Sequence, residues 1–134
     1  TRSTVLYAGI EVGGLVMSGD SGCNWAEIGH AVAGQTIHPD IHGLAICAAA
    51  PHVIYAATPD GVFVSETAGA TWESRSVGLD PMYCRPIAVH PADPMLVFAC
   101  TNLGQVFRST DGGERWTKLP REFGEIRGLV WAPN

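Results

Sequence analysis

Charged residues are scarce in this chain: Asp, Glu, Lys and Arg make up only 16% of its 134 residues. Such a low fraction suggests that another structural unit covers part of the outer surface. The formal net charge is −5, and no basic stripe with interleaved aromatic residues appears, which argues against nucleic acid as the main partner. No apolar run approaches the length of a membrane span, and no secretory n-region and h-region is present.

Helical periodicity and paired cysteines are also missing. No window sustains an apolar period of 3.6 residues over the length that a helix needs. The cysteines stand apart, with neither a CxxC pair nor the spacing of a zinc site, so we expect buried thiols rather than disulfides. The four are Cys23, Cys47, Cys84 and Cys100.

The histidines do not form a clear metal motif. The spacing of His38 and His42 suits two ligands on a helix, but Pro39 between them forbids a helix there. The other histidines are scattered, and none joins a second cluster of ligands. We therefore expect neither a metal nor a cofactor, and His38, Asp40 and His42 are the one local group to test.

What the chain does contain is a series of short apolar runs rich in Val, Ile, Tyr and Phe. Gly, Pro or Asp interrupts them every few residues, and the chain holds 16 Gly and 9 Pro. Runs of this kind, bounded by turn residues, predict β-strands. We therefore expect an all-β protein.

One eight-residue pattern, S-x-D-x-G-x-x-W, occurs at 18–25, 65–72 and 109–116. The second copy lacks only its aspartate and has Thr67 in that place. Its tryptophans are 47 and 44 residues apart, which is the length of one four-stranded propeller blade. Upstream segments repeat as well: 6–9 aligns with 54–57 and 97–100, and 14–18 with 61–65 and 105–109.

This pattern predicts a tight turn between the third and fourth strands of a sheet. The aspartate accepts hydrogen bonds from backbone N–H groups two or three residues on, and the glycine suits a positive φ. The tryptophan starts the next strand and packs against the neighbouring sheet. We expect a structural role for Ser18, Asp20, Gly22, Trp25, Ser65, Gly69, Trp72, Ser109, Asp111, Gly113 and Trp116.

The pattern and its spacing resemble the Asp-box, or BNR, repeat of sialidase-like, sortilin-like and photosystem-assembly-factor-like β-propellers. The resemblance implies about three blades of four antiparallel strands. Their boundaries fall near 1–35, 36–80 and 81–125, with a final inner strand in 126–134. Because Asp-box proteins are often exported, it also favours an extracytoplasmic location, although the compartment itself is not determined.

The strand count predicts an incomplete ring. The three blades receive three, four and four strands, and the strand left over is of the type that the first blade lacks. Three blades do not close a propeller and would leave sheet edges exposed. We therefore expect either part of a longer propeller, or two copies joined head to tail in a six-bladed ring with exchanged strands. The missing initiator Met does not decide between them.

Two arginines favour a binding scaffold. Arg85 and Arg127 fall at one repeat position, two residues before Ile87 and Leu129 on inner strands that line the channel. Guanidinium forks recognise carboxylate or phosphate, and photosystem-assembly-factor-like propellers bind protein partners through a charged face. The alternative is that each arginine pairs with a nearby glutamate, such as Glu122 or Glu125.

A glycoside hydrolase is the competing hypothesis. Arg85-Pro86-Ile87 departs from the Arg-Ile-Pro motif of sialidases, while Glu11-Val12-Gly13-Gly14 lies where xyloglucanase-like enzymes carry a catalytic aspartate. Glycoside hydrolysis needs a second carboxyl group roughly 5–9 Å away, for which Asp40, Asp60 and Asp80 are candidates. We expect a non-catalytic scaffold for a protein or carbohydrate ligand, with Glu11 as the catalytic alternative.

Overall fold

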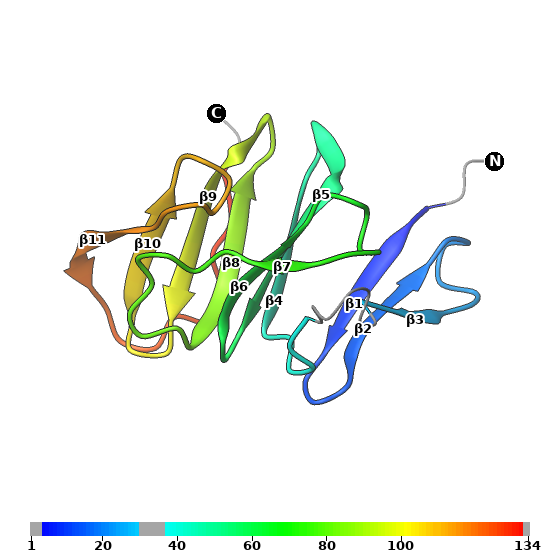
Figure 1. The fold of residues 1–134 in the computed structure, drawn as a ribbon, viewed down its shortest axis with the longest axis horizontal. Helices are drawn as coiled ribbons and strands as arrows, with labels where there is room; N and C mark the ends of the chain where they lie inside the picture. Colours follow the sequence, from blue (N-terminus) through cyan, green and yellow to red (C-terminus); the bar gives the residue numbers. More distant parts are fainter. Residues whose placement is uncertain (1–3, 30–36, 133–134) are drawn as a thin grey trace.

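The computed structural model describes residues 4–29 and 37–132, and within this part of the chain it contains eleven strands and no helix. The strands form three antiparallel sheets that lie side by side (Figure 1). Sheet 1 consists of β1 (Leu6–Ile10), β2 (Gly14–Ser18) and β3 (Ala26–Ile28). Sheet 2 consists of β4 (Gly43–Cys47), β5 (Ala50–Thr58), β6 (Gly61–Ser65) and β7 (Glu73–Ser74). Sheet 3 consists of β8 (Cys84–His90), β9 (Asp93–Thr101), β10 (Gln105–Ser109) and β11 (Thr117–Glu122).

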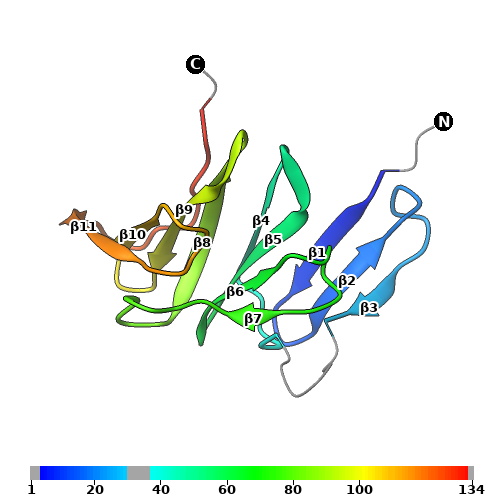
Figure 2. The same cartoon turned by 45° about the horizontal axis from the view of Figure 1, so that its top comes forward.

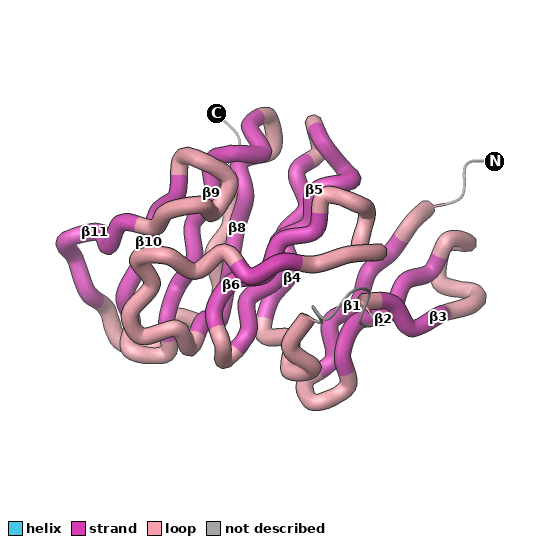
Figure 3. The backbone as a smooth tube through the Cα atoms, in the orientation of Figure 1, coloured by secondary structure: helices cyan, strands magenta, loops and turns pink. Residues whose placement is uncertain are grey.

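Each sheet is a meander, with its strands paired in the order of the chain. The S-x-D-x-G-x-x-W turn joins the last two strands of every sheet, as predicted. Figure 2 shows the sheets fanned out, with β4 of sheet 2 beside β8 of sheet 3. Figure 3 shows that strands joined by loops and turns make up the described backbone. The all-β prediction and the arrangement in propeller blades are confirmed. No described helix is long and apolar enough to cross a membrane.

The hydrophobic core lies between the sheets. Tyr55 and Val64 of sheet 2 pack with Phe107 and Trp116 of sheet 3 in one cluster. A second cluster joins sheets 1 and 2 and contains Leu15, Ile54 and Trp72. Strand side chains alternate between two faces, so a middle blade buries both of its faces and an end blade buries one. Burial between sheets is therefore the main stabilising term in this fold.

Sheet 1 lacks the inner strand that the other two sheets have. Strand β1 corresponds by repeat to β5 and β9, which pair with the inner strands β4 and β8; β1 pairs with β2 alone.

The final inner strand predicted within 126–134 is not formed in its described part, 126–132. A strand needs a hydrogen-bonded neighbour, and residues 126–132 are not paired with any strand of the three sheets. Its Trp131 ring instead packs edge-on against His90 and Phe98, with centroids 4.7 and 5.5 Å apart.

Candidate functional site

The three repeated turns share one hydrogen bond from a glycine to a serine. The backbone N–H of the glycine donates to the serine Oγ four residues earlier, at 2.8 Å in every copy. The glycines Gly22, Gly69 and Gly113 have φ values of 91°, 92° and 87°, in the left-handed region where a side chain would be strained. The serine is therefore the central acceptor of the turn.

The aspartate closes the turn in a different way from the one predicted. Asp20 Oδ1 accepts from the N–H of Asn24 at 2.8 Å, and Asp111 Oδ1 accepts from that of Arg115 at 3.0 Å. The bond thus spans four residues, not two or three, because the serine Oγ already holds the glycine N–H inside the loop. Thr67 Oγ1 does the same for the N–H of Thr71 at 2.8 Å, so the second turn keeps its geometry without a charge.

These hydrogen bonds favour the ionised carboxylates. The Asn24 side chain donates to Asp20 Oδ2 at 2.7 Å. Together with the backbone of Asn24 and the Ser18 hydroxyl, it lowers the pKa of Asp20 from 3.8 to about 2. The N–H of Arg115 and the Ser109 hydroxyl lower the pKa of Asp111 in the same sense. Both carboxylates therefore accept hydrogen bonds that close their turns, and these bonds favour the ionised form.

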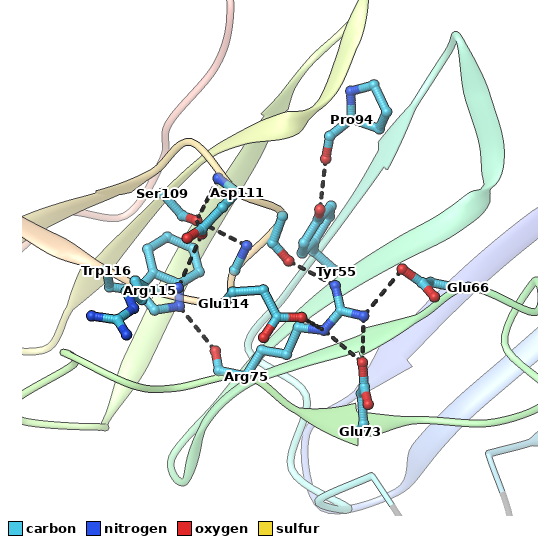
Figure 4. A network of polar contacts seen from close by, with 12 residues as sticks. Tyr55, Glu66, Glu73, Arg75, Pro94, Ser109, Asp111, Glu114, Arg115 and Trp116 are labelled. Carbon is cyan, nitrogen blue, oxygen red and sulfur yellow. Dashed lines mark hydrogen bonds and ion pairs between the residues drawn. The ribbon is translucent and has the colours of Figure 1, made fainter.

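Arg75 ties the second blade to the third (Figure 4). Its side chain is only 10% exposed and forms ion pairs with Glu66, Glu73 and Glu114. Its Nη1 donates to Gly112 O in the third turn at 2.9 Å, and its own carbonyl accepts from Trp116 Nε1 at 2.9 Å. The residue thus connects two neighbouring Asp-box turns. Motif analysis did not find it, because it lies three residues beyond the second pattern.

The predicted binding residues meet at the inner rim. Arg85 lies near the start of β8, Arg127 lies in the segment after sheet 3, and Glu11 lies in the β1–β2 turn. All three line one pocket of about 390 Å³, together with His42 and Glu125. The topology thus brings a predicted carboxylate and both predicted guanidinium groups together from three separate elements.

The two arginines differ in their surroundings. Arg127 Nη2 pairs with Glu125 Oε2 at 3.2 Å, and its side chain is 84% exposed. Arg85 lies over the Tyr83 ring, 5.4 Å from its centroid, and has no ion pair with another described residue. One arginine therefore has the local glutamate partner that the alternative foresaw, and the other does not. Glu122, the other glutamate considered, pairs instead with Lys118 at 2.9 Å.

His42 is a pocket residue that the sequence analysis treated only as a member of a metal group. Its ring contacts Tyr83 at 5.0 Å between centroids. Its Nδ1 lies 2.7 Å from Cys84 O, and its Nε2 lies 3.2 Å from Asp40 Oδ2. No described cluster of three or more His, Cys, Asp or Glu residues is placed to hold a metal ion.

Asp40, the other predicted aspartates and the cysteines lie in different surroundings. Asp40 Oδ1 is buried without a hydrogen-bond partner among the described residues. Asp60 and Asp80 do not line the inner-rim pocket, whereas Glu125 does and was overlooked as a second carboxyl. All described cysteines are free thiols: Cys47, Cys84 and Cys100 are buried as expected, and Cys23 is exposed. His30 lies outside the described residues.

A second hollow lies on the outer face of sheet 3. It measures about 670 Å³ and is mainly apolar, with Phe98, Val106 and Leu119 from the sheet and Leu129 from the last segment. The opposite end of the molecule, in sheet 1, carries the exposed apolar side chains of Leu6 and Trp25, which are 38% and 48% exposed.

Comparison with known proteins agrees with the fold. A family model described as Sortilin-Vps10 (sortilin, neurotensin receptor 3) matches residues 13–132. No curated protein matches the chain.

Several solved structures are similar to it. An ancestral GH74 enzyme matches with a TM-score of 0.73 at 17% identity, over 92% of this chain and 17% of the other. YCF48 bound to a D1 peptide matches with a TM-score of 0.65 at 19% identity, over 94% and 44%. The GH74 xyloglucanase from Xanthomonas campestris matches with a TM-score of 0.60 at 20% identity, over 82% and 15%.

The chain thus spans less than half the length of each of these structures. At these identities the likeness is one of fold, since one scaffold carries many functions. The resemblance to Asp-box propellers, predicted from the repeated turn, is confirmed. The matched residues cover most of the chain, which therefore belongs to the Sortilin-Vps10 family of β-propellers.

Proposed function

We propose that this chain is a non-catalytic propeller scaffold that binds an acidic segment of a protein partner at the inner-rim pocket. The observation that carries this proposal is that Arg85 and Arg127, far apart in sequence, line the same pocket. Two guanidinium groups at one pocket offer fork-shaped donors for carboxylates.

The partners of the two arginines leave room for a ligand. Arg85 has an aromatic neighbour but no described carboxylate partner, so its donors are open to an incoming anion. Arg127 has one exposed ion pair with Glu125, and exposed pairs contribute little free energy. A ligand carboxylate therefore competes with Glu125 at small cost. Glu11 and Glu125 at the same pocket would repel a ligand carboxylate that does not lie close to a guanidinium group, so they restrict where an anion can bind.

The structural neighbours support peptide binding on this kind of scaffold. YCF48, which has the same fold, was solved with a peptide bound. The proposal concerns the blades present here, because the chain spans 44% of YCF48.

A peptide-binding experiment tests the proposal. A fluorescein-labelled peptide of alternating glutamate and glycine should bind, as measured by anisotropy at low salt, and its glutamine counterpart should not. The double variant Arg85→Ala/Arg127→Ala should weaken binding about tenfold or more. Arg108→Ala/Arg115→Ala removes the same charge from exposed positions outside the pocket and serves as the matched control. Equal losses in the two double variants would contradict a specific site.

A glycoside hydrolase remains a second candidate, because Glu11 and Glu125 line one pocket and such enzymes act through two carboxyl groups. Reducing-sugar release from xyloglucan would reveal this activity, and Glu11→Gln should then abolish it. If no sugar is released from a panel of polysaccharides, this candidate is discarded.

The three blades also need further blades to close a ring. We propose that these come either from a second copy of the chain or from a longer polypeptide. A second copy would have to fit both open ends of this chain.

A further inference from the structure

The two internal junctions follow one rule. At each junction, the Asp-box tryptophan of one blade is buried against the blade that precedes it in the chain: Trp72 packs with sheet 1 and Trp116 with sheet 2. Both indoles are only 5% exposed. Trp25 occupies the same position in sheet 1 but faces no preceding blade, and it is 48% exposed.

The outer face of sheet 3 carries residues equivalent to those with which sheet 2 covers Trp116. In sheet 2, Tyr55 and Val62 belong to the cluster that covers Trp116. Their repeat equivalents in sheet 3 are Phe98 and Val106, which line the apolar hollow of about 670 Å³. This hollow is thus the face on which the tryptophan of a following blade would pack.

The strand registers give a second, independent match. The inner strands pair through Leu44 with Ala56 and through Ile87 with Ala99. In the alignment of the repeats, Leu129 takes the place of Leu44 and Ile87. Ala8 of β1 takes the place of Ala56 and Ala99. Leu129 already lies on the outer face of sheet 3, among the hollow residues, where the inner strand of a following blade belongs.

We propose that a second copy of this chain docks here, so that Trp25 of each copy enters the hollow of the other and Leu129 of each pairs opposite Ala8 of the other. The two contacts are equivalent and close a six-bladed ring. This inference rests on the propeller scaffold proposed above. Within one copy the contact is not possible, because sheet 2 lies between sheets 1 and 3 (Figure 1).

A second copy is the occupant that the structure favours, since both halves of the contact are present on this chain. Among the described residues no inner strand pairs with the edge of β1, and the unpaired segment 126–132 of a second copy has the register to supply one. Joining them covers an open strand edge and two apolar faces at once.

Light scattering on the purified chain tests the proposal directly. A mass of twice 14.2 kDa is expected at micromolar concentration, and a monomer at all concentrations overturns it. Trp25→Ala should raise the dissociation constant of the dimer by about thirtyfold or more, as for a tryptophan at the centre of an interface. Leu103→Ala, at a 62% exposed leucine in the β9–β10 turn, is the matched control and should leave the mass unchanged.

Disulfide trapping tests the register. In a Cys23→Ser background, Ala8→Cys/Leu129→Cys should yield a covalent dimer under mild oxidation, since paired Cβ atoms lie within reach of each other. Ala8→Cys/Val130→Cys should not, because a shift of one residue turns the side chain to the other face. Equal trapping of both variants overturns the register. A monomer that still binds the glutamate peptide refutes this inference alone, and a dimer without peptide binding refutes the binding proposal alone.

Discussion

Trp25 and Trp116 occupy the same place in two turns of the same design, yet their surroundings differ. Each follows a serine that accepts a glycine N–H at 2.8 Å. Trp116 is buried between two sheets and donates to Arg75 O across the junction, whereas Trp25 donates to Gly22 O within its own turn. The turn is therefore a local structure that forms in any blade, while burial of the indole depends on a neighbouring blade.

The largest expected effect comes from removing the side chain of the buried tryptophan, Trp116. Trp116→Ala removes a large side chain from the cluster between sheets 2 and 3, which should cost about 3–5 kcal/mol of unfolding free energy. Trp25→Ala at a protein concentration low enough to favour monomers should cost less than about 1 kcal/mol. Urea unfolding measures both. Equal losses would show that the indole stabilises its own turn and not the junction.

Arg75 allows a second comparison between a contact of two blades and a blade face that no other blade of the chain covers. Arg75→Ala should cost about 2–3 kcal/mol, below the 3–5 kcal/mol of a fully buried pair, because its glutamate partners are largely exposed. The loss arises from the bond to Gly112 O and the charges left without a cation. Arg75→Lys keeps the positive charge but not the forked guanidinium group. Its loss of stability should therefore be smaller than that of Arg75→Ala but greater than zero. Thermal unfolding of both variants checks the order, and full recovery by lysine would contradict a role for the fork.

The second turn differs from the other two in having the Thr67 hydroxyl in place of the capping aspartate, which gives a comparison by pH. The folded pKa of Asp20 is lowered to about 2, so its contribution to stability is present above the ordinary value of 3.8 and is lost as the pH falls towards 2. Asp111 acts in the same direction. The amide shifts of Asn24 and Arg115 should therefore titrate in this range, while that of Thr71, which donates to Thr67, should not. Nuclear magnetic resonance spectra recorded from pH 5 to about 2 would show this, and a parallel change at Thr71 would indicate global unfolding.

The smallest effect concerns the cysteines. Burial raises the pKa of Cys84 to about 12 and that of Cys100 to about 11, and Cys47 is enclosed by the carbonyls of His90 and Pro91. Only the exposed Cys23 should react quickly with a disulfide reagent in the native protein, and all four thiols should react after denaturation. Cys23→Ser should remove the fast phase. A fast phase that survives this change would mean that a buried thiol is accessible.

The sequence allowed the blades to be predicted because their signal is local. Ser, Gly and Trp at fixed spacing define a turn whose hydrogen bonds lie within five residues, and alternating apolar runs define the strands beside it. The inner-rim residues Arg85 and Arg127 were found for the same reason, since the repeat places them at one position. Arg75 was missed because its contacts with Gly112 and Glu114 come from another sheet. Glu125 was considered only as a partner for an arginine, because its place at the same pocket as Glu11 depends on the fold. The strand expected in 126–134 is not assigned in residues 126–132, because strand propensity alone does not supply a hydrogen-bonded neighbour.

Fluorine resonance of the chain labelled with 5-fluorotryptophan tests the contrast between end faces and junctions most directly. Assignment by single Trp→Phe variants separates the four indoles. The account predicts that Trp72 and Trp116 show no solvent isotope shift at any protein concentration. It also predicts that Trp25 shows a clear shift in dilute samples and loses it as copies associate. A solvent-exposed Trp72 or Trp116, or a Trp25 that is protected in the monomer, would contradict it.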